Sequence, residues 1–278
     1  MTYQSEVLAD SPVVYLELNE TSGTAAVDQG SHAVNGTYQN GVTLNQSGMT
    51  GITPAAQFDG TNDLIDIPDH ADLDITGDLT LEAWIYPTSY ANWRMLITKV
   101  NGDTGPYQWL LHTGTGLPEF RHSTFSVINA SAVPALNVWN HLAVTRSGTT
   151  VTHYLNGAVN GSGTVSGTVL ANAEPVRIGR RLETDYYFVG KMMQVAIYNT
   201  ALSQARLQAH IDSLPPPIVR VSQVGAEALV LPNPVARVSE VAAEALVAIS
   251  PTVRVSQVGV EVLVPYRLSG GRPRVIWF

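Results

Sequence analysis

The clearest structural signal in this sequence is the stretch Leu79-Thr80-Leu81-Glu82-Ala83-Trp84-Ile85-Tyr86. Its odd-numbered positions are all apolar, and its even-numbered positions carry polar or aromatic side chains. A period of two is typical of a β-strand, because successive side chains point to opposite faces of a sheet. We therefore predict a strand that packs into a core on one face and is partly covered on the other.

Comparable runs of strand length lie on both sides of this stretch, between clusters of Gly, Asn, Asp and Ser. These runs are Val13–Leu18, Leu64–Ile67, Gln108–His112, Val138–Thr145, Val151–Asn156 and Met192–Tyr198. The dipeptides Asn156-Gly157 and Asn160-Gly161 predict turns, because both residue types tolerate positive φ. Many short strands without helices between them predict an all-β sandwich or barrel.

Only one segment, after the last predicted strand, has the sequence pattern of an α-helix. Ser203 is suited to be its N-cap, and apolar residues recur on one face over residues 204–214. Three consecutive prolines at 215–217 then favour an extended spacer. We therefore predict a sandwich domain at 1–214 and a linker at 215–218.

Residues 219–264 contain three copies of a repeat with a period of 17 residues. The first copy reads Val-Arg-Val-Ser-Gln-Val-Gly-Ala-Glu-Ala-Leu-Val, and Arg, Ser, Glu and Leu recur at the same offsets in the other two. The alternation predicts three short β units, each too small to bury its own apolar face. Residues 265–278 follow as an apolar end.

Two interpretations of the repeats are open. The favoured one is that they pair with sister subunits or dock on the sheet edge of a partner, since unpaired strands of this kind aggregate. The other is that they fold as a small independent β unit. The residues expected to make oligomerisation or anchoring contacts are Val221, Val224, Leu229, Val238, Leu246, Val255, Val258 and Leu263.

Composition excludes several classes of protein. The chain has 278 residues, a net charge of −8 and no cysteine, so disulfides and thiolate metal sites are absent and nucleic acid is not expected as a partner. No apolar run approaches the roughly 18 residues that a membrane helix needs, so membrane insertion is not expected. The N-terminus lacks the pattern of a signal peptide, which predicts synthesis in the cytoplasm without export by that route.

Residues 1–214 resemble the laminin-G-like, concanavalin A-like lectin/glucanase jelly-roll domains. The resemblance lies in an ordered set of motifs that runs along most of this region. They include Phe58-Asp59-Gly60-Thr61-Asn62-Asp63, Leu79-Thr80-Leu81-Glu82-Ala83-Trp84-Ile85, Trp139-Asn140-His141-Leu142-Ala143-Val144, Tyr154-Leu155-Asn156-Gly157 and Val195-Ala196-Ile197-Tyr198. The resemblance implies an antiparallel jelly-roll β-sandwich of the concanavalin A type.

The repeats at 219–264 resemble those of bacteriophage tail and other virion proteins. Together the two resemblances imply a phage virion structural protein, a capsid decoration or tail-associated protein, that is displayed on the virion surface after assembly in the host cytoplasm. Its partners would be sister subunits and other virion proteins. The alternative is a host-recognition adhesin whose rim loops bind glycan on the cell surface.

No catalytic residues are predicted. Glycoside hydrolysis needs two carboxylates about 5 to 9.5 Å apart, and the resemblance implies a Glu-x-Asp-x-x-Glu strand in the glucanases. This chain lacks that pattern. The nearest pairs are Glu17 with Glu20 and Asp78 with Glu82. A spacing of three puts Glu17 and Glu20 on opposite faces of a strand, and Asp78 lies in the turn before the strand of Glu82. We therefore expect a protein that is not an enzyme.

No cofactor is predicted, with calcium as the one alternative. Asp59, Asn62 and Asp63 form an oxygen-rich loop of the kind that binds calcium. The favoured interpretation is that these side chains cap a tight turn that contains a glycine. Where the related domains often have an acidic pair, this chain has Met193 and Gln194, which weakens the calcium interpretation further.

Two loops carry residue types suited to a sugar, whose apolar face stacks on aromatic rings while amides and charges bind its hydroxyls. They are Ser89–Arg94 and Arg180–Tyr187, and the loop that ends at Tyr107 borders them. The alternative is that these aromatic side chains fill the edge of the sandwich. The predicted glycan-binding residues are Tyr90, Asn92, Trp93, Arg94, Tyr107, Tyr186 and Tyr187.

Overall fold

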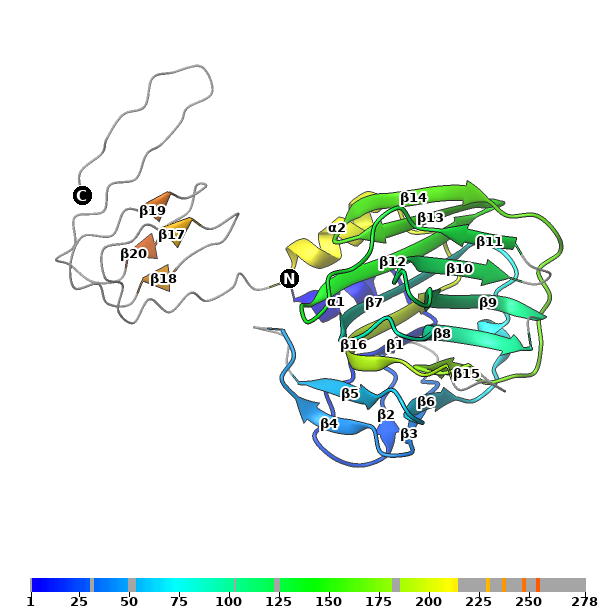
Figure 1. Ribbon diagram of the computed structural model, residues 1–278, viewed down its shortest axis with the longest axis horizontal. Coiled ribbons are helices and arrows are strands. Elements are labelled where there is room, and N and C mark those ends of the chain that lie inside the picture. The colour runs from blue at the N-terminus through cyan, green and yellow to red at the C-terminus, as the bar shows by residue number, and fades with distance from the viewer. Residues whose placement is uncertain are drawn as a thin grey trace, which may run out of the picture. The chain divides into compact units, whose positions relative to one another are not determined.

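The computed structural model describes residues 2–30, 33–49, 54–102, 104–122, 126–181 and 186–214, and the backbones of four two-residue strands further on. The chain divides into two compact units, Met1–Leu214 and Pro215–Phe278. The first unit is a sandwich of two eight-stranded sheets (Figure 1). The predicted all-β sandwich is confirmed, and it is consistent with a jelly roll.

The first sheet contains the strand predicted at 79–86, at its centre. Its strands are β1 (Val14–Leu16), β4 (Thr43–Gln46), β5 (Ala55–Asp59), β7 (Leu79–Pro87), β12 (Asn140–Ser147), β13 (Thr150–Leu155), β14 (Ala158–Thr164) and β16 (Val189–Tyr198). They lie in the order β14-β13-β12-β7-β16-β5-β4, and β1 also pairs with β16. All these pairings are antiparallel.

The second sheet faces the first across the core. Its strands are β2 (Ala25–Ala26), β3 (Gly36–Gln39), β6 (Leu64–Ile67), β8 (Arg94–Asn101), β9 (Thr104–Leu111), β10 (Pro118–His122), β11 (Ser126–Asn129) and β15 (Val176–Ile178). They lie in the order β11-β10-β9-β8-β15-β6-β3-β2, again with antiparallel pairings.

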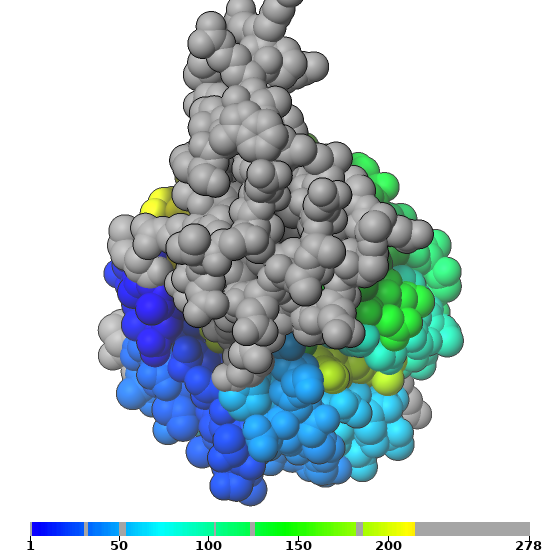
Figure 2. Space-filling model, turned by 90° about the vertical axis from the view of Figure 1, so that its left-hand side faces the viewer, coloured from blue at the N-terminus to red at the C-terminus, as the bar shows by residue number. Residues whose placement is uncertain are grey.

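The early strands of the two sheets lie close together at one side of the sandwich. There β4 pairs with β5 in the first sheet, and β3 pairs with β6 in the second. In the space-filling view the blue N-terminal segments and the light-blue segments that follow them form one continuous surface (Figure 2). This side is therefore built almost entirely from the first part of the chain.

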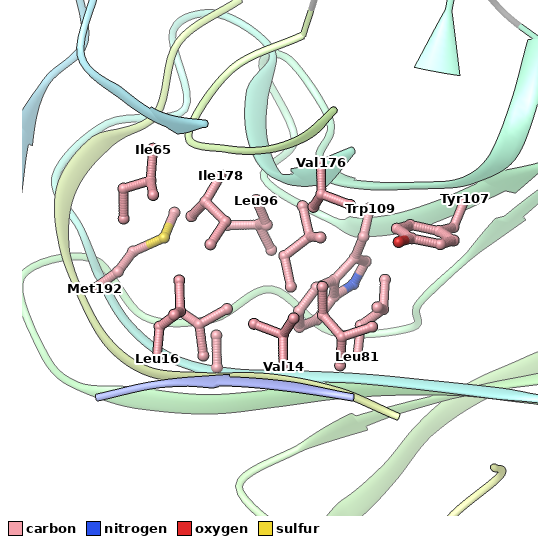
Figure 3. Close-up of a cluster of buried hydrophobic side chains, with 14 of the residues drawn as sticks. Val14, Leu16, Ile65, Leu81, Leu96, Tyr107, Trp109, Val176, Ile178 and Met192 are labelled. Carbon is pink, nitrogen blue, oxygen red and sulfur yellow. The ribbon is translucent and has the colours of Figure 1, made fainter. Parts of the chain in front are cut away.

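The main core is the layer of apolar side chains between the two sheets. Leu81 of β7 lies on the first sheet and Trp109 of β9 on the second, and both side chains are fully buried within this layer (Figure 3). Each fully buried large apolar side chain contributes about 1.5–3 kcal/mol to folding. The alternation of β7 is therefore explained, because its odd-numbered residues face this layer.

Two α-helices cover part of the outer face of the first sheet. They are α1 (Tyr3–Ala9) and α2 (Gln204–Asp212), and a short 3-10 helix spans Ala71–Leu73. Apolar residues of both helices pack against Trp84 and Tyr198 in a second, smaller core. Within the described residues, neither α-helix is long and apolar enough to cross a membrane.

The beginning of α2 was predicted and α1 was not. The Ser203 side chain accepts a hydrogen bond from the Arg206 amide at 3.3 Å, which confirms Ser203 as an N-cap. The first helix is capped by Thr2, whose side chain and backbone exchange hydrogen bonds with Ser5. Its sequence signal was missed because Ser5 stands where such a capping motif usually has Glu or Gln.

One of the two predicted turns is present and the other is wrong. Asn156 and Gly157 both have positive φ and connect β13 to β14. Asn160 and Gly161 instead lie inside β14. The buried Asn160 side chain bonds the backbone N–H and C=O of Ala132. The loop after β11, at the adjacent edge of the second sheet, therefore holds Asn160 within a strand in place of the turn expected from local sequence.

The second unit is described only in the backbones of β17 (Leu229–Val230), β18 (Arg237–Val238), β19 (Val247–Ala248) and β20 (Arg254–Val255). There β17 pairs with β19 and β18 with β20, both in parallel. The linker 215–218, the end 265–278 and the anchoring residues Val221, Val224, Leu246, Val258 and Leu263 lie outside the described residues. The anchoring role of the repeats stays a prediction.

Candidate functional site

Three side chains gather around Trp93 at the end of the second sheet where β8 begins. The half-buried Trp93 ring lies 4.3 Å from the His112 ring and 6.2 Å from the Tyr186 ring, centroid to centroid. The guanidinium carbon of Arg121 lies 4.8 Å from the centre of the Trp93 ring. We call Trp93, His112, Arg121 and Tyr186 the Trp93 cluster.

Strand pairing brings these residues together from distant parts of the sequence. Arg94 pairs with Leu111 across β8 and β9, which places their neighbours Trp93 and His112 side by side. Gln108 of β9 pairs with Arg121 of β10 in the same sheet. Arg121 therefore lies on a strand, and Trp93 and His112 directly adjoin the ends of paired strands, whereas Tyr186 comes from the loop before β16.

Arg121 is held in place by a buried carboxylate. Its side chain forms an ion pair with Glu119, two residues earlier on β10 and 1% exposed. A guanidinium fixed near an aromatic ring keeps other N–H groups available as donors. The Trp93 cluster thus combines aromatic surface with a cation and an imidazole, the kinds of group that contact the apolar face and the hydroxyls of a sugar.

Arg94 and Tyr187 were predicted to contact a glycan, but the structure gives them a supporting position. Arg94 is 8% exposed, and its guanidinium donates to the carbonyl oxygens of Ser89 at 3.2 Å and of Tyr187 at 2.9 Å. Tyr187 is 7% exposed, and the Arg180 guanidinium lies 5.3 Å from the centre of its ring. These contacts tie the two predicted loops together beneath the cluster.

Tyr90 and Asn92 also shape the loop before β8. The half-buried Tyr90 donates a hydrogen bond from its hydroxyl to the Pro134 carbonyl, and burial raises its pKa to about 12. Gly116 has φ +74°, and a Cβ there would lie 2.5 Å from the Tyr90 ring, so only glycine fits. The Asn92 side chain accepts a hydrogen bond from the Trp93 amide at 2.8 Å.

The prediction that Tyr107 borders the glycan site is wrong. Tyr107 lies on β9 and is fully buried in the main core, where its hydroxyl donates to the Leu73 carbonyl at 3.1 Å. The sequence contained a signal for this position, because Tyr107 shares its parity with the apolar residues Trp109 and Leu111. Period-two alternation alone would have placed Tyr107 on the same, core-facing side of the strand as Trp109 and Leu111.

The loop at 59–63 makes the contacts of a capped turn. Asp59 accepts from the Thr61 amide at 2.7 Å and from the Asn62 amide at 3.3 Å, and Asp63 accepts from the Asp59 amide at 2.9 Å. Burial raises the pKa of Asp63, although its hydrogen bond with Asp59 opposes this. Calcium binding at this loop remains the alternative interpretation. Within the described residues, no group of three or more acidic or histidine side chains could hold a metal.

The acidic pair typical of the related domains is replaced at a structural irregularity. Gln194 has φ +57° and lies where the pairing of β16 with β7 shifts in register, as at a β-bulge. Its side chain accepts a hydrogen bond from the hydroxyl of Tyr15. Gln194 and Tyr15 are both buried, so this position serves the packing of β1 on β16.

His112 and Arg121 were missed by the sequence analysis. Arg121 is a single polar residue within a strand, and His112 directly follows one. The residues that flank them in the sequence are like those that flank any exposed polar residue of a strand. Only the pairing of β8, β9 and β10 shows that both reach Trp93. A prediction would have required the register of the second sheet.

The two antiparallel sheets and the aromatic cluster at one end of the second sheet define a lectin-like β-sandwich. The chain belongs to the concanavalin A-like lectin/glucanase superfamily, because a family model of the laminin G type matches residues 59–208. A search of curated proteins found no match.

Solved structures share the fold at low sequence identity. The binding domain of Paraclostridial Mosquitocidal Protein 1 is 16% identical, with a TM-score of 0.63 over 77% of this chain and 55% of that chain. The botulinum neurotoxin serotype D binding domain is 16% identical, with a TM-score of 0.57 over 76% and 54%. This chain therefore spans about half the length of these two toxin domains.

A third structure matches over almost its whole length. It is domain 4 of AbnA, a GH43 extracellular arabinanase from Geobacillus stearothermophilus, in complex with arabinotriose. The identity is 18% and the TM-score 0.59, over 72% of this chain and 98% of that domain. At these identities the likeness establishes the fold alone.

Proposed function

We propose that residues 1–214 are a carbohydrate-binding domain and that the Trp93 cluster is its binding surface. The observation that carries this proposal is the half-buried Trp93 ring with Arg121 at 4.8 Å and Tyr186 at 6.2 Å. An aromatic ring beside fixed hydrogen-bond donors suits a sugar, because the ring packs on its apolar C–H groups and the donors bind its hydroxyls.

The structural neighbours support a binding role. Domain 4 of AbnA, described in complex with arabinotriose, is matched over 98% of its length. Another neighbour comes from botulinum neurotoxin type C, whose cell entry is described as dependent upon interaction with two ganglioside molecules; this chain covers 52% of that structure. Glycan on a cell surface is therefore the ligand class that we propose for this protein.

We also propose that the domain binds without catalysing. Glu82 is fully buried under the helices, and its carboxylate contacts Tyr198 and His210. Glu20 accepts hydrogen bonds from the Tyr38 hydroxyl at 2.6 Å and the Val27 amide at 2.8 Å, and Glu17 accepts one from Asn19. These carboxylates have structural partners and do not flank an open site as hydrolysis requires.

Truncation of Trp93 tests the binding proposal. Trp93→Ala and Tyr186→Ala should each weaken binding to a glycan-array hit by about 30-fold or more, since an aromatic hot spot contributes about 2 kcal/mol. Trp139→Ala is the matched control, because Trp139 is a half-buried tryptophan packed on the outer face of the other sheet. Equal losses in the Trp93 and Trp139 variants, or no glycan bound by the wild type, would refute the proposal.

A second proposal concerns the repeats at 219–264. We propose that they fasten the sandwich to sister subunits or other proteins of a bacteriophage particle, with the sandwich displayed on the virion surface. The 17-residue period supports this, because single repeats cannot bury their own apolar faces. Deletion of residues 215–278 should leave a folded, monomeric sandwich that is absent from purified particles. Unchanged incorporation of the deletion variant would contradict the proposal.

A further inference from the structure

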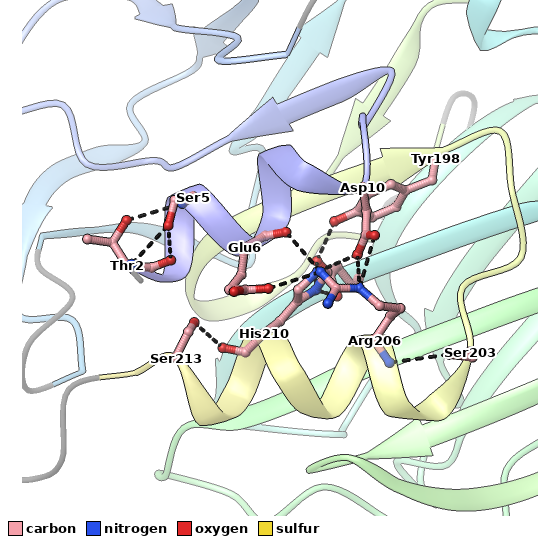
Figure 4. Close-up of polar contacts among 10 residues, drawn as sticks. Thr2, Ser5, Glu6, Asp10, Tyr198, Ser203, Arg206, His210 and Ser213 are labelled. Carbon is pink, nitrogen blue, oxygen red and sulfur yellow. Dashed lines mark hydrogen bonds and ion pairs between the residues drawn. The ribbon is translucent and has the colours of Figure 1, made fainter.

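The histidine at the centre of α2 is buried between two carboxylates. His210 is fully buried, and its Nδ1 lies 3.1 Å from a carboxylate oxygen of Glu82 on β7. Its Nε2 lies 2.9 Å from an oxygen of Asp10, the residue that caps the end of α1 (Figure 4). Because a carboxylate oxygen only accepts, each ring nitrogen must carry a proton to bond both partners.

Each helix or strand that packs around His210 contributes charged or titratable side chains to its surroundings. From α1 come Glu6 and the edge of the Tyr3 ring, and from β16 comes Tyr198, whose hydroxyl donates to Glu82 at 2.8 Å. The His141 ring on β12 lies 3.5 Å from the Glu82 carboxylate. The complete set is Tyr3, Glu6, Asp10, Glu82, His141, Tyr198 and Arg206.

Arg206 completes the connection between the helices. From the first turn of α2 its guanidinium bonds both oxygens of Asp10 at 3.0 Å and the Glu6 carboxylate at 3.0 Å (Figure 4). Arg206 is part-exposed, whereas His210 is buried and is the group that also reaches the sheet through Glu82. His210 thus links α1, α2 and β7 at one point.

We propose that protonated His210 is a clamp that holds α1 and α2 on the first sheet, and that loss of its proton opens this clamp. A neutral imidazole has one N–H and one acceptor nitrogen. One of the two carboxylates would then face a lone pair at about the same distance, without a donor. The helices would lose either the bond of His210 to Asp10, which leaves Arg206 as the remaining bridge between them, or the bond of His210 to Glu82 on the sheet.

The direction of the pH dependence follows from the surroundings. Burial lowers the pKa of His210, but the hydrogen bonds and charges of Glu82 and Asp10 outweigh it, so the pKa is raised above its ordinary value. The folded protein therefore holds this proton more tightly than the unfolded chain does. The stabilisation is complete below about pH 6.5 and is lost as the pH rises through the raised pKa.

The effect is measurable as helix opening. One proton is released on opening, so the equilibrium constant for opening should rise about tenfold per pH unit between about 6.5, the ordinary pKa of histidine, and the raised folded pKa of His210, and it should level off above that folded pKa. Because α2 is the last helix of the sandwich unit, its opening loosens the end of that unit. The clamp would keep α1 and α2 docked on the first sheet in neutral or mildly acidic medium and would allow them to open more often in alkaline medium.

Nuclear magnetic resonance on the full-length protein tests the clamp directly. Both ring nitrogens of His210 should be protonated at neutral pH, and their titration midpoint should lie above about 6.5. Hydrogen exchange in α1 and α2, corrected for its intrinsic pH dependence, should accelerate as the pH rises toward this midpoint and should level off above it. A neutral His210 ring at pH 6.5, or exchange without a matching midpoint, would overturn the proposal.

Two variants separate the clamp from general stability. His210→Gln should show fast exchange in both helices already at neutral pH, with no midpoint. His153→Gln is the matched control, because His153 is also buried but bonds only the Ile128 carbonyl, at 3.0 Å; it should keep the wild-type midpoint in α1 and α2. If His210→Gln does not fold, the titration of the wild-type protein decides alone.

Discussion

Replacing Glu82 by Gln should lower the free energy of unfolding by about 3–5 kcal/mol at neutral pH. Glu82 is fully buried, accepts from Tyr198 at 2.8 Å and His210 at 3.1 Å, and faces His141 at 3.5 Å. Burial alone would raise its pKa, but the hydrogen bond from His210 and the nearby His141 ring lower it to about 2. The carboxylate is therefore charged, and its removal leaves a buried imidazolium with one partner fewer.

Differential scanning calorimetry on the full-length protein measures this loss. For a domain of 150–250 residues, each kcal/mol corresponds to about 2–4 °C, so the melting temperature should fall by about 6–20 °C. The loss should shrink at alkaline pH, because His210 is then neutral and no charge is left unpaired. The volume of Gln matches that of Glu, so a cavity does not account for the change.

Glu17→Gln is the matched control for Glu82→Gln. Glu17 is also a glutamate of the first-sheet region, but it is half-buried, and among the described residues its carboxylate bonds only the Asn19 side-chain amide, at 3.0 Å. Its replacement should cost about 1 kcal/mol or less. A loss below about 1 kcal/mol for Glu82→Gln, or equal losses for both variants, would refute the assignment of a charged buried cluster.

Three further outcomes follow from the described contacts. Tyr107→Phe should lower stability by about 1 kcal/mol in urea unfolding, since it removes the bond to Leu73, and should leave glycan affinity unchanged; a loss of affinity would return Tyr107 to the binding site. Burial lowers the pKa of His153 to about 4, although its bond to Ile128 opposes this. The folded state therefore resists protonation, and stability should fall by about 3 kcal/mol between pH 6.5 and 4; His153→Gln should flatten that slope, and an unchanged slope would contradict it. Millimolar calcium should leave the melting temperature unchanged, because one oxygen of Asp59 and one of Asp63 already accept backbone amides within the turn; a rise that Asp63→Asn abolishes would establish a calcium site.

The candidate site was predictable in part. Trp93 and Tyr186 stand in loops whose composition marked them, and the structure places them 6.2 Å apart. Arg121 and His112 could not be found, because they reach Trp93 through strand register, which one sequence does not specify. Composition also did not distinguish Arg94, which holds the loops together, from residues that face outward.

The sequence by itself determined the strands that have a clear alternation, and β7 is the best example. The odd-numbered apolar residues of 79–86 face the core in β7, because alternation is a property of the extended backbone and needs no distant partner. The Asn-Gly turn at 156–157 and the Ser203 cap are equally local.

Tertiary structure alone decided which polar residues meet. Asp10, Glu82 and His210 are spread over 200 positions of the chain, yet a single histidine contacts both carboxylates. Their sequence pattern is that of ordinary polar residues on a helix and on the outer face of a strand. They become a buried cluster only because two helices cover that face, and the free energy of a charge depends on what surrounds it in space, not on its neighbours in the chain.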